Sequence, residues 1–347
     1  MDLSNLSKYR SHIMGMATIF ITLCHTSLVF SESLKYVQYA YAVFVVNIMQ
    51  FGVDIFLLLS GLGCYFSYAK QTEYYRFEKK RLLRLLTPYI IVIIPVIIFD
   101  VTLNDINPLL AIYQESLISF FISGHLNLWF IGAILLLYIF FPLVFNLVNK
   151  DSRIVLSICA IFIAIVLLPF WNKLPLQIPL IREIFLCRIP VFIIGAYIGK
   201  LLFTKKNIVV NKYIVLLVFF FSLTIIVLLK LWSEIKNADY NITIIRLLFL
   251  PLALSFSLIF SHCLNKISYN KFFDKSFVFF GSISYTMFLI FVRILSYTKL
   301  IFNHFDLILI SNVITSVIIN AIAIAVSILL SIIVQRFSDK LNAYFKT

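Results

Sequence analysis

The residue with the clearest chemical potential is a histidine inside an apolar stretch. Residues 19–30 read IFITLCHTSLVF, and His25 lies near the middle of them. A titratable ring in such a run is costly unless another group pairs with it or uses it. Imidazole changes charge near neutral pH, so His25 is a candidate general base or acyl-carrying group. The alternative is a histidine that hydrogen-bonds to a neighbouring helix and only supports packing.

A carboxylate occurs in the next apolar run, NIMQFGVDIFLLLSGLGCYFSY, which contains Asp54. Asp54 falls near the middle of the membrane in this run, and a carboxylate at that depth should face the protein interior and have a partner. One candidate partner is His25, whose ring Asp54 would then orient for catalysis. The other is a residue of another helix, in a contact that serves packing alone. Ser60, Gly61 and Gly63 follow as a small-residue patch, which suits close helix packing or the approach of a ligand to the backbone.

Arginines form the third group of candidates. Arg10 precedes His25 by 15 residues, or about 22 Å along a helix, so the two side chains could hold the two ends of one long ligand. Arg81 and Arg84 stand at i, i+3 on one helical face in KKRLLRLL, where forked donors suit phosphate binding. For each of the three arginines, the alternative is a positive anchor at the membrane surface, with affinity for anionic lipid.

Ser60 and three further residues are candidates to line a cavity. Trp129 begins an apolar run at the expected outer interface, where aromatic residues are usual. Glu183 and Arg188 lie about one and a half turns apart, so they either neutralise each other or line a cavity. The sequence contains no GxSxG, P-loop, GxGxxG or HExxH motif, and no spacing that indicates a metal site, so no metal is expected.

The composition indicates which elements must position these residues. The chain has 347 residues, of which 62% are hydrophobic and 13% are charged, whereas soluble domains are typically about 45–50% apolar and about 25% charged. Apolar runs long enough to cross a bilayer recur along the chain. The net charge of +14 is spread between these runs, which indicates membrane topology rather than nucleic-acid binding. We therefore predict an all-α polytopic membrane protein, with a single transmembrane domain over residues 1–347 and no soluble domain.

Hydropathy predicts about ten transmembrane helices. Residues 107–126 are apolar but contain Glu115, so we expect an interfacial or re-entrant helix there rather than an eleventh span. With the N-terminus inside, most of the 29 Lys and Arg residues fall in inside segments, which predicts an N-in, C-in protein. The predicted spans are 12–30, 42–69, 83–103, 126–148, 153–170, 184–203, 212–232, 243–263, 276–299 and 307–335.

Six stretches, in this order along the chain, resemble the membrane-bound acyltransferase-3 family, the bacterial integral-membrane enzymes that O-acylate cell-surface sugars. They are YRSHIMGMATIFITLCH, FGVDIFLLLSGLGCYF, KKRLLRLLTPY, LWFIGAILLLYIFFPL, RIPVFIIGAYIG and GSISYTMFLI. The resemblance implies a transferase of groups other than amino-acyl groups, which moves acetyl from cytoplasmic acetyl-CoA, or another acyl group from its acyl-CoA, to a glycan hydroxyl. It implies a multi-pass protein of the bacterial cytoplasmic (inner) membrane. The expected partners are the lipid bilayer, the glycan acceptor and a separate extracytoplasmic transferase if one is needed, with no nucleic acid.

The resemblance also assigns roles to residues. It implies that His25 is essential and that the Arg81–Arg84 pair is needed, and we expect these arginines and Arg10 to bind the phosphates of CoA. Two positions depart from the family pattern. Met14 stands where the family usually has an arginine, so Arg10, one turn earlier, is the candidate substitute. Phe291 stands where the family often has a histidine.

Two rival functions use the same charges differently. In a transporter or flippase of polysaccharide units they would line a pathway, but such proteins often show two matching halves, and the sequence shows none. A membrane glycan polymerase would usually need a large outer loop, and the predicted outer loops are short.

Overall fold

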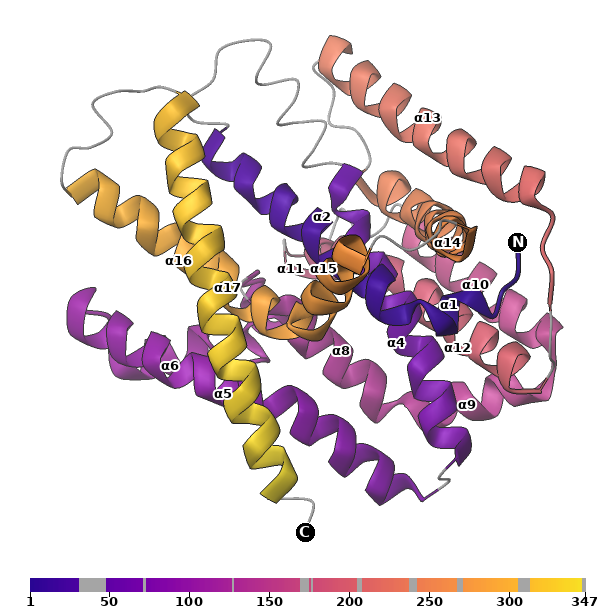
Figure 1. Cartoon of the computed structure of the whole chain (residues 1–347), viewed down its shortest axis with the longest axis horizontal. Helices are drawn as coiled ribbons and strands as arrows, with labels where there is room; N and C mark the ends of the chain where they lie inside the picture. The colour runs from indigo at the N-terminus through magenta and orange to yellow at the C-terminus, as the bar shows by residue number, and fades with distance from the viewer. Residues whose placement is uncertain are drawn as a thin grey trace. The chain divides into compact units, whose positions relative to one another are not determined.

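The structure is a computed structural model that describes residues 1–30, 48–70, 73–126, 128–168, 175, 177–204, 208–236, 242–266, 271–304 and 313–344. Helices make up 90% of it, and the described part has no strand, only an isolated bridge between Asp2 and Val209 (Figure 1). The all-α prediction is therefore confirmed. Residues 42–47 and 307–312, which the sequence assigns to two of the spans, lie outside the described residues.

Seven helical stretches within the described residues are long and apolar enough to cross a membrane, or up to eight if a bent pair counts as one span. The chain is thus a polytopic membrane protein, whereas the count of ten and the orientation stay predictions. Helix α2 (Arg10–Phe30) has 21 residues, and α10 (Ser152–Leu167) is apolar but shorter. The seven stretches correspond to α4 (Phe51–Lys70), α5 (Tyr74–Leu103), α11 (Gln177–Ile184) with η2 (Leu186–Arg188) and α12 (Ile189–Thr204), α13 (Lys212–Lys236), α14 (Ile242–Lys266), α16 (Ser284–His304) and α17 (Val313–Tyr344).

Two predicted spans are broken helices. The span over 126–148 consists of α8 (Trp129–Ile139) and α9 (Phe141–Lys150), bent by 56°, with a proline in the first turn of α9. Proline lacks a backbone N–H and is best tolerated in the first turn of a helix, which fits a break before α9. The span over 276–299 is replaced by α15 (Lys271–Ser282) and α16, which meet at Ile283.

The stretch between the third and fourth predicted spans forms only short helices. These are α6 (Pro108–Gln114) and α7 (Ser119–Ser123), each far too short to cross a bilayer. The prediction that 107–126 is not a further span is confirmed.

Contacts divide the chain into two compact units. Unit 1 comprises residues 1–10, 54–86 and 93–268, and unit 2 comprises 11–53, 87–92 and 269–347. This division does not test the prediction of a single membrane domain. Helices α13 and α14 lie side by side in unit 1, as α16 and α17 do in unit 2 (Figure 1).

Glycines let the helices that carry the candidate residues approach closely. In unit 1 a methyl group added at Gly61 of α4 would collide with the Phe192 carbonyl of α12, and one at Gly195 with the Leu58 carbonyl. In unit 2 a methyl at Gly15 of α2 would collide with the Phe277 carbonyl of α15. These crossings hold α4 and α2 at backbone contact with their neighbours.

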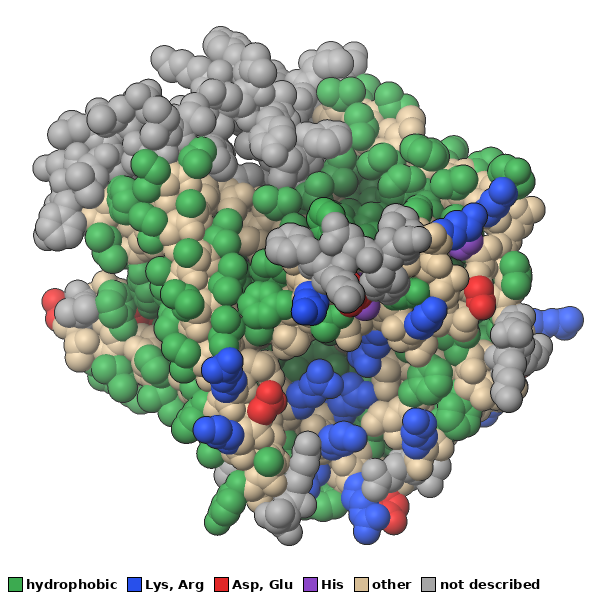
Figure 2. Space-filling view, in the orientation of Figure 1, with side chains coloured by type: hydrophobic (Ala, Val, Ile, Leu, Met, Phe, Trp, Pro, Cys, Tyr) green, Lys and Arg blue, Asp and Glu red, His purple; other side chains and the backbone are tan. Residues whose placement is uncertain are grey.

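Apolar side chains cover the outward surfaces of several helices, as the green areas of Figure 2 show. On α13 the exposed residues include Ile214, Leu217, Phe220, Phe221 and Leu228. Apolar surface of this extent suits contact with lipid rather than water. On the face of the protein that Figure 2 shows, Lys and Arg side chains are more frequent than Asp and Glu, in line with the net charge of +14.

Candidate functional site

Two arginines converge on Gly63 of α4, in unit 1. The Arg81 Nη2 donates a hydrogen bond of 2.7 Å to the Gly63 carbonyl. The Arg10 guanidinium lies against the same residue, because a methyl group added at Gly63 would stand 2.6 Å from Arg10 Nη2 and 2.8 Å from its Cζ. Gly63 is therefore the point where the first turn of α2 and the second turn of α5 meet α4.

Aromatic rings hold Arg81 in place. Its Cζ lies 5.6 Å from the centroid of the Phe77 ring and 5.3 Å from that of Tyr138, within the range of cation–π attraction. Arg81 is buried, whereas Arg84, one turn further along α5, is exposed. Arg81 and Arg84 are both among the charges that act on Arg10. The structure thus brings together the three arginines that the sequence assigned to phosphate binding.

The Arg81–Arg84 segment is part of a long helix rather than a loop. Helix α5 begins at Tyr74, so KKRLLRLL forms its early turns and Arg81 and Arg84 share one face, as predicted. The same face carries Glu78 one turn before Arg81. Glu78 is buried, and its carboxylate acts electrostatically on Arg81 and on the neighbouring Cys64. Neither Glu78 nor Tyr138 belongs to a motif that the sequence reveals as functional.

Asp54 near the start of α4 is paired with an arginine. Its Oδ2 accepts a hydrogen bond of 3.3 Å from Arg188 Nε, and both residues are almost completely buried. Arg188 Nη1 also donates to the Ile184 carbonyl at 2.5 Å, and the guanidinium Cζ lies 5.0 Å from the centroid of the Trp129 ring. Asp54 is also within electrostatic reach of Arg246. Asp54 therefore pairs with a residue outside its own helix, which is the second of the two alternatives that the sequence left open. Its role in orienting His25 stays a prediction.

The predicted neutralisation of Glu183 by Arg188 is wrong. Glu183 pairs instead with the adjacent Arg182, at 2.7 Å. The physical reason is the break between α11 and α12. A 3₁₀ turn forms there, in which the backbone N–H of Arg188 bonds to the Phe185 carbonyl, and the Arg188 side chain donates to the Ile184 carbonyl and to Asp54 instead of Glu183.

A cavity-lining role stays a prediction for Ser60, Trp129, Glu183 and Arg188. Ser60 is buried on α4 beside Gly61, at the close crossing with α12. Trp129, at the start of α8, covers the Arg188 guanidinium. Close helix packing, which the small-residue patch predicts, is confirmed at Gly61. Gly63 lies instead against the Arg10 guanidinium.

His25 lies in unit 2, on α2, and its side chain is half-buried. The adjacent Thr26 is buried, and its carbonyl accepts a hydrogen bond of 3.3 Å from Asn320 Nδ2 of α17. One to two turns earlier, the Phe20 ring lies 5.1 Å from the ring of Phe51. The histidine is thus carried by a helix with neighbours on two sides.

The two positions that depart from the family pattern are also in unit 2. Phe291 of α16 is 2% exposed and belongs to an apolar cluster with Met287, Leu295, Ile319 and Ala323. It fills a core position with no polar neighbour in that cluster. Met14 is half-buried on α2, where its carbonyl accepts a hydrogen bond from Thr18.

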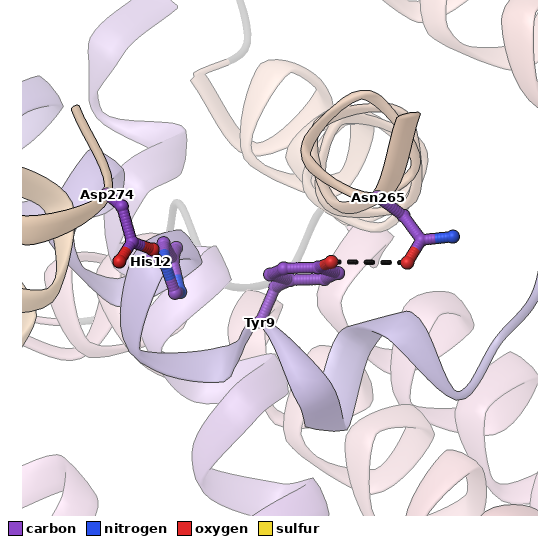
Figure 3. A network of polar contacts seen from close by, with 4 residues as sticks. All are labelled: Tyr9, His12, Asn265 and Asp274. Carbon is purple, nitrogen blue, oxygen red and sulfur yellow. Dashed lines mark hydrogen bonds and ion pairs between the residues drawn. The ribbon is translucent and has the colours of Figure 1, made fainter. Parts of the chain in front are cut away.

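Two polar pairs escaped the sequence analysis, and Figure 3 shows both. In unit 1 the Tyr9 hydroxyl donates to Asn265 Oδ1 at 3.1 Å, which ties the N-terminal segment to α14. In unit 2 His12 Nε2 lies 2.5 Å from Asp274 Oδ1, beside the crossing of α2 and α15. Partners more than 250 residues apart leave no signal in sequence spacing, so only the structure could reveal them.

Comparison with protein families decides the class of the protein. The family model described as "Acyltransferase domain" matches residues 13–336, nearly the whole chain. The chain belongs to the acyltransferase-3 family. The match includes His25, Arg81 and Arg84 but begins after Arg10. Comparison with curated proteins and with solved structures gave no match.

Membership of the acyltransferase-3 family makes this a multi-pass membrane acyltransferase. The arrangement around Gly63 is rich in cationic side chains. Three arginines gather there, and forked guanidinium donors match the oxygen atoms of phosphate. The Asp54–Arg188 pair is different, because its opposite charges are buried against each other. Among the described residues, no group of three or more His, Cys, Asp or Glu could hold a metal ion.

Proposed function

We propose that the protein is an O-acyltransferase that moves an acetyl group from cytoplasmic acetyl-CoA to a hydroxyl of a cell-surface or exported polysaccharide. The observation that carries the proposal is the convergence of Arg10 and Arg81 on Gly63, with Arg84 nearby, in a chain of the acyltransferase-3 family. In this proposal the three arginines bind the phosphates of the acyl donor. The protein resides in the bacterial cytoplasmic membrane.

The donor site is partly preorganised. The hydrogen bond to Gly63 and the two aromatic rings already hold Arg81, so binding phosphate costs little further ordering of this side chain. The exposed Arg84 adds a charge at the entrance to the site. A lipid anchor would need only a charge near the headgroups, and burying an arginine behind aromatic rings would serve no purpose there.

His25 supplies the chemistry in this proposal. Arg10 and His25 stand 15 residues apart on the continuous helix α2, which is about 22 Å. That separation suits a long donor with phosphates at one end and a thioester at the other. His25 Nε2 or Nδ1 takes the proton of the acceptor hydroxyl, the new C–O bond forms as the acyl C–S bond breaks, and the proton passes to the departing thiolate of CoA.

The test is the acetyl content of the surface glycan in cells that carry His25→Ala. We expect acetyl groups to be lost while glycan chain length and the amount of membrane protein stay normal. His262→Ala, at a half-buried histidine of α14, is the matched control and should retain acetylation. Full acetylation in His25→Ala cells would refute the role of His25. Shortened or unexported glycan would instead indicate a polymerase or transporter.

A further inference from the structure

Glu78 is an anomaly within the arginine group around Gly63. Its side chain is buried, with the residue 6% exposed, and both carboxylate oxygens lack a hydrogen-bond partner among the described residues. Buried polar atoms are nearly always hydrogen-bonded, and an exception calls for a physical explanation. This one stands beside the site that we assign to the donor.

A structural counter-ion would be hydrogen-bonded to its arginine. Arg81 is the natural candidate, one turn away on α5, but its Nη2 donates to the Gly63 carbonyl. Glu78 and Arg81 act on each other electrostatically without an ion pair between them in the described structure. Glu78 therefore offsets part of the positive charge of the arginines, while neither of its oxygens accepts a hydrogen bond from a described residue.

A carboxylate is also unfavourable in a site for phosphate alone, because it repels the anion. It is favourable where the ligand brings hydrogen-bond donors next to its phosphates. The nucleotide part of CoA has both: phosphate oxygens, which accept, and the adenine amino group and ribose hydroxyl, which donate. Carboxylates bind ribose hydroxyls in this way in dinucleotide sites of other folds.

Helix α5 carries the hydrogen-bond acceptor and the phosphate-binding groups one after another along its length. Glu78, Arg81 and Arg84 are spaced three residues apart, so each step advances about 4.5 Å along the axis and turns about 60°. Arg10 and Cys64 complete the surroundings, since the Cys64 thiol lies within electrostatic reach of Arg10, Arg81 and Glu78 together. A nucleotide along this face meets one acceptor group and then two phosphate-binding groups.

We propose that Glu78 accepts hydrogen bonds from the adenosine part of the acyl donor and so makes the site selective for a nucleotide over a simple phosphate. The inference rests on the proposed function, in which the donor is an acyl-CoA. It adds a specificity-determining residue that neither the sequence pattern nor the family match assigns.

The experiment measures the affinity of detergent-purified, full-length protein for two probes, CoA and inorganic pyrophosphate. In Glu78→Ala and the isosteric Glu78→Gln, we expect CoA to bind about tenfold more weakly, as for loss of a hydrogen bond to a charged group. Pyrophosphate should bind equally well or more tightly, because a repulsive charge is gone. Glu73→Gln removes a carboxylate from an exposed pair with Arg76 beside the same helix, and should change neither affinity.

Each outcome has one meaning. Unchanged CoA affinity in both Glu78 variants overturns the inference, as does an equal weakening of CoA and pyrophosphate, which would indicate a general loss of the site. Failure of the underlying function looks different: the wild-type protein would not bind CoA, or Arg84→Ala would bind it as well as wild type does. Thermal unfolding of each variant identifies one that is misfolded, and the other Glu78 variant then decides.

Discussion

The two ends of helix α4 handle charge in opposite ways. Near its start, Asp54 is hydrogen-bonded to Arg188 and lies within electrostatic reach of Arg246, and the Asp54 and Arg188 side chains are almost completely buried. Nine residues later, about 14 Å along the axis, Gly63 faces two arginines with a third nearby. The first end is compensated and closed, whereas the second has an excess of positive charge.

Helix α4 therefore contacts a charge-compensated pair near its start and an uncompensated group of arginines near its end. The opposite charges of a buried pair compensate each other, so the pair offers little net charge to an anionic ligand. An excess of like charge is unfavourable by itself and becomes favourable when an anion binds. Asp54 and Arg188 compensate each other within unit 1, whereas Arg10, Arg81 and Arg84 are the residues that we propose bind the donor.

The largest effect is expected from removing Arg188, the hydrogen-bond partner of Asp54. Arg188→Ala leaves the Asp54 carboxylate buried without its partner, which typically costs about 3–5 kcal/mol of stability. We expect little folded protein in membranes and a lower midpoint of thermal unfolding in detergent. Asp54→Leu combined with Arg188→Met should recover part of the loss. Arg76→Ala, which removes an exposed pair with Glu73, should cost less than about 1 kcal/mol. Equal losses from Arg188→Ala and Arg76→Ala would contradict the comparison.

The next effect separates two glycines of α4 that are half a turn apart. Gly61→Ala drives a methyl group into the Phe192 carbonyl, and overpacking of this kind costs about 1–3 kcal/mol. Gly63→Ala meets only the end of the Arg10 side chain, which can move away, so stability should change little. Donor affinity should fall in Gly63→Ala because Arg10 is displaced. Thermal unfolding and CoA titration on the same samples check both halves, and loss of stability in Gly63→Ala would argue against a movable Arg10.

A smaller effect isolates the binding charge. Arg84→Ala removes an exposed side chain, so the unfolding midpoint should stay near that of wild type while CoA binds about tenfold more weakly, or about 1.4 kcal/mol. Arg81→Ala should weaken CoA binding as well, but also destabilise the protein by about 1–3 kcal/mol, because a buried hydrogen bond from a charged group and two ring contacts are lost. Equal destabilisation by both variants would erase the distinction between the two arginines.

The smallest effect is the response to salt. Raising ionic strength from 0.1 M to 1 M shortens the screening length from about 10 Å to about 3 Å. CoA affinity should fall severalfold, because the exposed Arg84 is screened. The unfolding midpoint should depend on the buried Asp54–Arg188 pair and barely respond. A titration series and an unfolding series in the same buffers measure the two, and CoA affinity that ignores salt would count against an electrostatic donor site.

Prediction from sequence succeeded where chemistry and local periodicity coincide. Arg81 and Arg84 at i, i+3 had to share a helical face, and they do. The structure places the Arg10 guanidinium beside Arg81 at Gly63, while its role as a substitute for the family arginine at Met14 stays a prediction. For Arg188, one of the two alternatives, neutralisation of the nearby Glu183, is not what the structure shows. A helix break redirected that side chain, and no spacing rule anticipates which way it turns.

Composition and hydropathy alone determined that the chain is an all-α membrane protein, because only helices satisfy the backbone of such apolar runs in lipid. The ordered motifs determined its family, since they record residue types and not contacts. Tertiary structure alone decided which distant charges meet: Asp54 with Arg188, His12 with Asp274, and Arg10 with Arg81 at Gly63. These groups are far apart in sequence, and the close glycine crossings of the helices determine which of them become neighbours.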